Sequence, residues 1–222
     1  MKKFKLKGYI KGAVITQLVL IIVLLLMEFI LKIEKEPMSQ ILEANMMLID
    51  TLGRITFVMF ASVMISKIVI SEYNNKTINL MFMYPISRKK IFISKLIIVA
   101  TFTFINIIIS NILLTLSLFI ANSIFEFLPW TLTIDNIMSM VPNVLLNSIL
   151  ASVTALIPLY FGMKKKSVTT TILSAFLVVV VMYSNSGGFT ISSILPIAIV
   201  VAIIGLLVGV GTLNKLDDED II

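Results

Sequence analysis

Long apolar runs alternate with short polar connections along the whole chain. Most runs hold about 18 or more largely uncharged residues, enough for a helix rising 1.5 Å per residue to cross a hydrocarbon core roughly 30 Å thick. The first run is as long as a full span and lacks a small-residue cleavage site, so we expect a retained helix rather than a signal peptide. The pattern predicts six spans: Tyr9–Leu31, Met46–Ile70, Leu96–Ile120, Ile137–Phe161, Ser167–Tyr183 and Thr190–Leu213.

Six apolar spans predict an all-α, polytopic membrane protein with a single transmembrane domain over residues 1–222. An even number of spans places both termini on one side, and basic residues decide which side because they stay in the cytoplasm. Basic residues precede the first span, surround the second connection and fill the fourth, at Lys164, Lys165 and Lys166. We therefore expect both termini in the cytoplasm. Lysine greatly outnumbers arginine, and isoleucine and asparagine are abundant, which suggests an AT-rich bacterial genome and spans in a bacterial cytoplasmic membrane.

The composition agrees with a membrane protein and excludes several kinds of chemistry. Hydrophobic residues make up 59% of the chain and charged residues 14%, too few to cover a soluble surface. There is no cysteine and no histidine, which removes disulfides, thiol catalysis and the commonest base and metal ligand. The net charge is +6, and the basic residues lie beside apolar spans, so the lipid bilayer is a simpler partner than nucleic acid. We expect no metal site, no cofactor in the chain and no nucleic-acid partner.

The segment between the second and third spans is unusual for a loop. Ile78 and the run Leu80–Tyr84 place apolar side chains nearly all round a short helix, which water would solvate poorly. Pro85 disfavours helical geometry before it, and Ser87 can cap a new helix that leads into the third span. From the residues alone, this short helix either docks on a partner or folds back against the membrane or the cytoplasmic ends of its own spans.

The same segment carries a family resemblance. Its residues match in spacing the pattern Glu-aromatic, Thr, Leu, Pro-Ile-Ser-Arg, then Lys, at Glu72, Tyr73, Thr77, Leu80, Pro85, Ile86, Ser87, Arg88 and Lys95. The chain thereby resembles the permeases of type 2 ATP-binding-cassette (ABC) transporters, including bacterial peptide and antibiotic exporters. Lys76 stands where the family often has glycine, which favours continuous helix there.

The resemblance implies a permease that pairs with a second permease, of the same or a homologous chain, and with two ABC ATPase subunits. Residues 71–95 would then dock on the ATPase through Glu72, Tyr73, Thr77, Ile78, Leu80, Met81, Phe82, Tyr84, Pro85, Arg88 and Lys95. No Gly-x-x-x-x-Gly-Lys-Ser/Thr phosphate loop occurs, so we expect no enzyme activity in this chain and Mg-ATP on the partner ATPase. An apolar interior suits hydrophobic or amphipathic cargo, such as antimicrobial peptides.

Polar residues inside the third and fourth spans recur on one face of each helix. They are Thr103, Asn106 and Ser110 in the third span and Asn143, Asn147 and Thr154 in the fourth. The simpler interpretation is hydrogen bonding between helices, worth about 0.6 kcal/mol a pair; the alternative is a translocation path lined by these six side chains. Pro142 and Pro158 are expected to kink the fourth span.

Two further patterns concern the second and sixth spans. Asp50 and Arg54 stand one helical turn apart and predict a structural ion pair, with a gating or substrate role as the alternative. In the sixth span small residues at Ala198, Ala202, Gly205 and Gly209 predict a stripe where another helix approaches closely.

Other functions fit the sequence less well than transport. An intramembrane metalloprotease needs histidine ligands, and an ion-coupled carrier needs carboxylates near the middle of its spans, where this sequence has none. A membrane scaffold or sensor stays open as the alternative function.

Overall fold

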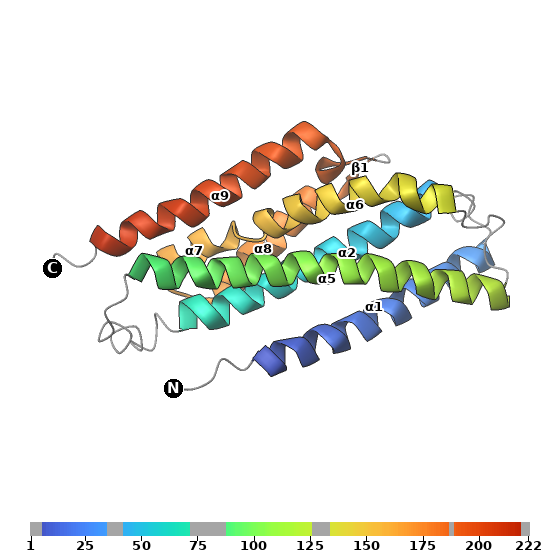
Figure 1. The fold of residues 1–222 in the computed structure, drawn as a ribbon, viewed down its shortest axis with the longest axis horizontal. Coiled ribbons are helices and arrows are strands. Elements are labelled where there is room, and N and C mark those ends of the chain that lie inside the picture. The colour runs from blue at the N-terminus through green and yellow to red at the C-terminus, as the bar shows by residue number, and fades with distance from the viewer. Residues whose placement is uncertain (1–5, 35–41, 72–87, 126–133, 187–188, 219–222) are drawn as a thin grey trace. The chain divides into compact units, whose positions relative to one another are not determined.

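The structure is a computed structural model that describes residues 6–34, 42–71, 88–125, 134–186 and 189–218 (Figure 1). The chain divides into two compact units, each described here by itself. Unit 1 comprises Met1–Arg54 and Asn106–Asn147, and unit 2 comprises Ile55–Ile105 and Ser148–Ile222. The single permease domain over residues 1–222 stays a prediction.

The all-α prediction is confirmed. The helices are α1 (Leu6–Glu34), α2 (Leu42–Ile65, continued by a π-helical turn Ser66–Ile70), α5 (Arg88–Phe125), α6 (Ile134–Thr154), α7 (Pro158–Lys165), α8 (Val168–Tyr183) and α9 (Leu195–Asp218). Within the part of the chain that the structure describes, five spans are long and apolar enough to cross a membrane: Gly8–Leu31, Ala44–Ile70, Lys90–Ile124, Met138–Lys165 and Leu195–Thr212. The sixth, α8, has 16 residues and is about 24 Å long, so it reaches most of the way across a bilayer.

Helix α1 shows why a lipid environment is needed. Its buried side chains form one stripe at Ala13, Gln17, Leu20, Leu24 and Glu28, spaced three or four residues apart. The remaining faces expose large apolar side chains almost without interruption, such as Ile15, which is 63% exposed. Apolar surface of this extent is stable only against lipid or another protein, which agrees with a membrane span.

The fourth span differs from its predicted form at one of its two prolines. Helix α6 continues through Pro142, whereas the helix is interrupted at residues 155–157, directly before Pro158. The backbone N–H groups of Leu156 and Ile157 bond three residues back, to Val153 and Thr154, at 3.0 Å each. Pro158 has no N–H and would clash with a carbonyl of the preceding turn, so it stands at the start of α7 instead.

The last span begins later than predicted. A two-residue antiparallel hairpin precedes it, in which β1 (Asn185–Ser186) pairs with β2 (Phe189–Thr190). A single 3₁₀ turn, Ile191–Ser193, follows the hairpin, and α9 begins at Leu195 rather than at Thr190. Thr190 and Ser192 bond to each other through their hydroxyl groups at 3.1 Å, which satisfies two buried side chains in this connection.

Unit 2 is built around the hairpin of α7 and α8, with α9 beside α7 (Figure 1). Lys166 turns the chain in the left-handed region, at φ 47°, and Ser167 then caps α8 by accepting the Thr170 N–H at 3.5 Å. Gly162 allows the two helices to approach, because a Cβ at this position would collide with Thr171 Oγ1. Close packing of this kind holds transmembrane helices together without a hydrophobic driving force.

Candidate functional site

A buried carboxylate, Asp50 of α2, lies about 9 Å along the helix from the start of its span at Ala44. Arg54, one turn further on, places Nη2 2.9 Å from Asp50 Oδ2, and both side chains are buried. Arg54 Nε also donates to the backbone oxygen of Asp50 at 3.3 Å. The two charges expected to pair therefore do so in the structure, which lowers the cost of burying each.

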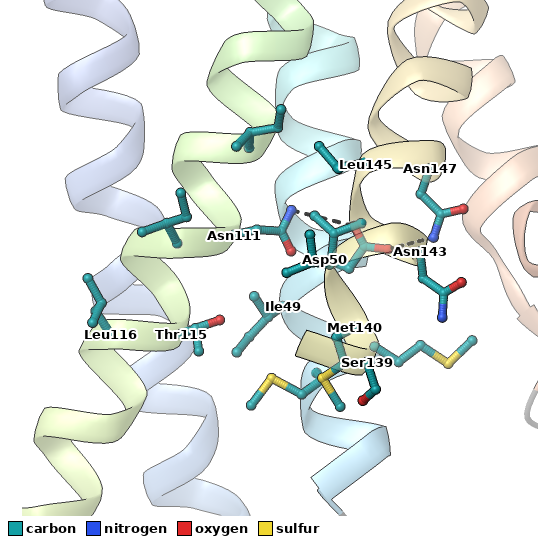
Figure 2. Close-up of a pocket in the computed structure, with 16 residues that line it drawn as sticks. Ile49, Asp50, Asn111, Thr115, Leu116, Ser139, Met140, Asn143, Leu145 and Asn147 are labelled. Atoms are coloured by element: carbon teal, nitrogen blue, oxygen red, sulfur yellow. Dashed lines mark hydrogen bonds between the residues drawn. The ribbon is translucent and has the colours of Figure 1, made fainter. Parts of the chain in front are cut away.

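Two amides from other helices complete the surroundings of the carboxylate. Asn147 Nδ2 of α6 donates to Oδ2 at 3.1 Å, and Asn111 Nδ2 of α5 lies 3.5 Å from Oδ1. Figure 2 shows Asp50 between these two side chains, with a dashed line to each. Asn111 also donates to the Ile107 carbonyl of its own helix at 3.0 Å, so its contact with Asp50 is the weaker of the two. Asp50 thus ties together three helices of unit 1.

A cavity of about 730 Å³ opens beside this cluster, entirely within unit 1 (Figure 2). Asp50, Asn111, Asn147 and Asn143 give it a polar wall, and apolar side chains that include several methionines form the rest. Its lining comprises Met46, Met47, Ile49, Asp50, Ile108, Asn111, Ile112, Thr115, Leu116, Ser139, Met140, Val141, Asn143, Val144, Leu145 and Asn147. A mainly apolar hollow with a few convergent polar groups is the usual form of a ligand-binding site.

The six polar residues expected along a translocation path are divided between the units. Asn106, Ser110, Asn143 and Asn147 belong to unit 1, where Asn143 and Asn147 line the cavity, while Thr103 and Thr154 belong to unit 2. The Thr103 and Thr154 hydroxyls donate to carbonyls of their own helices, at Val99 and Leu150. Ser110 Oγ is buried without a hydrogen-bond partner in the described part of the chain and lies against Gly53. Asn147, in contrast, donates its hydrogen bond to another helix, at Asp50 of α2.

Sequence reasoning missed Asn111, which directly follows Ser110. The periodicity of the third span favoured the face with Ser110, and Asn111 falls about 100° further round the helix. A different signal could have identified it: an intramembrane aspartate needs hydrogen-bond donors, and asparagine is the natural neutral donor in another span.

The segment expected to dock on an ATPase lies largely outside the described residues, which resume at Arg88, the first residue of α5. Lys95 is described and buried, and its Nζ donates at 3.2 Å to the Ile68 carbonyl. That carbonyl belongs to the π-helical turn at the end of the second span. Turns of this type are frequent at functional sites. Lys95 therefore joins the two chain ends that flank the segment at residues 72–87.

The small residues of α9 are buried, as a packing face requires. A Cβ on Gly205 would lie 2.6 Å from the backbone oxygen of Val153, so this position admits no side chain without a shift of the backbone. A Cβ on Gly209 would meet Leu96 and Leu156 at ordinary contact distances of 3.7 and 3.9 Å. The close approach in this stripe is therefore concentrated at Gly205.

Comparison with known proteins assigns the chain to a family. The profile of the family described as "ABC-2 family transporter protein" matches residues 1–182, most of the chain. The chain belongs to the ABC-2 transporter family. It is 37% identical over 220 residues to a Bacillus subtilis (strain 168) protein named "Uncharacterized protein YcbO", covering 99% of this chain and 96% of that protein. No solved structure matches this chain.

As a member of the ABC-2 family, the chain is a membrane component of a transporter and not the component that catalyses ATP hydrolysis. Membership also implies association with an ABC ATPase and with the membrane. The resemblance stated for the segment at residues 72–95 is confirmed at the level of the family.

Proposed function

We propose that the chain is the permease of an ATP-driven ABC exporter in the cytoplasmic membrane of a bacterium. It would work as a homodimer or as a heterodimer with a homologous permease, together with two ATPase subunits that bind Mg-ATP. The family match over residues 1–182 carries this proposal. The distribution of basic residues supports cytoplasmic termini, since lysines cluster at the chain start and in the connections on the same side.

We infer that the cavity of unit 1 lies on the substrate's path. Asp50, Asn111 and Asn147 meet there, and Asn143 adds a further amide. An asparagine amide carries both donors and an acceptor, which suits a ligand that has to satisfy N–H and C=O groups away from water. The apolar walls would accommodate the hydrophobic side of the same ligand. This combination supports a hydrophobic or amphipathic substrate, including antimicrobial peptides.

The proposed coupling route begins at the segment around residues 72–87 and continues through Arg88 into α5. ATP binding would draw two motor subunits together, and α5, a 38-residue helix, would carry the movement into the membrane as a rigid lever. Lys95 supports this route because it fixes α5 to the π-helical turn at Ile68.

Affinity purification from mild detergent tests the partnership with an ATPase. The wild-type chain is expected to retain an ABC ATPase and, in a heterodimer, a second permease. The variants Phe82→Asp and Pro85→Leu should insert in the membrane at normal levels and lose the ATPase. Lys11→Gln, which changes an exposed residue of α1, is the matched control. Unchanged recovery of the ATPase with both docking variants would contradict the proposed docking segment.

The alternative function, a membrane scaffold or sensor without transport, predicts a different outcome. A scaffold would retain its partners, but vesicles that contain it would move amphipathic peptides no faster on addition of nucleotide than vesicles that lack it. ATP-dependent peptide accumulation in inside-out vesicles that contain the chain and its ATPase would therefore decide for transport.

A further inference from the structure

A second hollow, in unit 2, has an apolar wall and a lysine side chain at one end. This groove has a volume of about 500 Å³ and is lined by residues of α7, α8 and α9. Its apolar floor follows α8 through Leu173, Leu177 and Val181, each of them 58 to 63% exposed and spaced one turn apart. Lys165 and Thr170 line its other end. Among the described residues, no carboxylate lines the groove.

The charged end of the groove is strongly basic. Lys165 stands between Lys164 and Lys166, and all three are exposed at the turn between α7 and α8. Three adjacent lysines beside an apolar surface in a membrane attract anionic lipid headgroups, by about 1 kcal/mol for each residue near the surface. A helix from a second copy of the chain would offer this end no matching negative charge unless it carried a carboxylate there.

The length of the groove matches one leaflet of a bilayer. From Thr170 to Val181 the helix rises about 16 Å, at 1.5 Å per residue. Half of a hydrocarbon core roughly 30 Å thick is about 15 Å. A lipid with its phosphate at Lys165 would thus have an acyl chain of the right length to lie along Leu173, Leu177 and Val181.

We propose that the α7–α8 groove binds an anionic phospholipid, with the headgroup phosphate at Lys165 and Thr170 and one acyl chain along Leu173, Leu177 and Val181. The site is separate from the cavity beside Asp50, which belongs to unit 1. It requires neither the ATPase nor a transported substrate, so its failure and that of the proposed function are distinguishable.

Thermal stability of the full chain in mild detergent tests the site. The probes are phosphatidylglycerol and phosphatidylcholine with identical 16-carbon chains, and inorganic phosphate alone. At about ten times its dissociation constant, phosphatidylglycerol should raise the Tm of a chain of this size by about 3 to 6 °C. Phosphatidylcholine should raise it less, and inorganic phosphate should leave it unchanged. An equal shift with inorganic phosphate would overturn the proposal, because no acyl chain would then be needed.

Two variants separate the headgroup from the acyl chain. Lys165→Gln should abolish most of the difference between phosphatidylglycerol and phosphatidylcholine, whereas Lys11→Gln, a loss of the same charge on α1, should retain it. Leu177→Trp fills the groove and should reduce the shift with both lipids. Leu207→Trp, on an exposed position of α9 that does not line the groove, should leave it intact.

The lipid shift has to depend on both ends of the groove. If either Lys165→Gln or Leu177→Trp kept the full shift with phosphatidylglycerol, the proposed site would be wrong. A second copy of the chain is the competing occupant: a Leu177→Cys variant that forms disulfide-linked dimers in bilayers at high yield would show that protein covers the groove and would overturn the lipid site.

Discussion

The two units differ in the hydrogen bonds that their intramembrane polar groups make. In unit 1 Asp50 receives donors from its own helix and from two others, at Asn111 and Asn147. In unit 2 hydroxyl groups such as those of Thr154 and Thr171 donate to carbonyls of their own helix or of its cap, and glycines bring the helices together. Side-chain bonds between helices thus surround the carboxylate of unit 1, beside a hollow with a polar wall. In unit 2 Lys95 also bonds to a second helix, but the hydroxyls bond locally and the helices can pack closely. This contrast supports the proposal that the substrate binds in unit 1, and it makes unit 2 a closely packed unit.

The largest expected effect comes from breaking the ion pair of unit 1. Asp50→Leu leaves Arg54 buried without its carboxylate, which should cost about 3 to 5 kcal/mol of stability. The double variant Asp50→Leu/Arg54→Leu should recover much of the loss, because no uncompensated charge remains. Denaturant unfolding in detergent measures both. An Asp50→Leu protein as stable as the wild type would refute the pairing.

Lys95 gives the next largest effect, and it tests the connection between α5 and the π-helical turn of unit 2. Lys95→Met removes a buried, charge-assisted hydrogen bond to the Ile68 carbonyl, at a cost of about 1.5 to 3 kcal/mol. Lys95→Arg keeps the charge and should retain part of the bond. The same unfolding measurement compares them, with Lys67→Gln, an exposed position in that turn, as control. Equal stability of all the variants would show that the bond contributes nothing.

The glycines of α9 test whether unit 2 is held by close packing. Gly205→Ala pushes a methyl group against the Val153 backbone oxygen and should cost about 1 to 3 kcal/mol. Gly209→Ala should be tolerated, since its Cβ meets only ordinary contacts, and Gly211→Ala, with nothing within 4 Å, should gain helix propensity. Melting temperatures rank the three. Equal melting temperatures of Gly205→Ala and Gly209→Ala would contradict the close packing of unit 2.

The smallest effect on stability distinguishes the two asparagines of α6 that line the cavity. Asn147→Leu loses the bond to Asp50 and should cost about 0.6 kcal/mol, a typical value for polar pairs within membranes. Among the described residues no hydrogen bond joins Asn143 to Asp50, so Asn143→Leu should leave the Tm unchanged. Transport should suffer in both variants because both side chains line the cavity. A larger loss of stability in Asn143→Leu than in Asn147→Leu would reverse the assignment.

The spans could be predicted from the sequence because a helix must have a long apolar run to cross the hydrocarbon core of a bilayer. The sequence also predicted a pair at Asp50 and Arg54, since residues four apart on one helix are neighbours whatever surrounds them. Local proline chemistry pointed to Pro158, although it gave Pro142 equal weight. The helix is interrupted directly before Pro158 and continues through Pro142, a difference that the sequence does not indicate.

The arrangement around Asp50 could not be predicted, because it depends on which faces of three helices meet. Periodicity along the third span ranked Ser110 above Asn111, and only the rotation of α5 brings Asn111 to the carboxylate. The π-helical turn Ser66–Ile70 likewise has no recognisable signal in the sequence. Gly205 and Gly209 of α9 looked equivalent in sequence and differ only through their distances to neighbouring helices.

One measurement tests most directly whether the cavity of unit 1 lies on the substrate's path. Inside-out vesicles that contain the permease and its co-purified ATPase are supplied with ATP and a fluorescent amphipathic peptide, and accumulation is followed over time. The variant Ser123→Leu, which replaces a polar residue of α5 outside the cavity lining, is the control. It is expected to accumulate the peptide at the same rate as the wild type. Asn143→Leu should accumulate it at least about tenfold more slowly, a change of about 1.4 kcal/mol, with an unchanged Tm. Wild-type accumulation by Asn143→Leu would contradict the account.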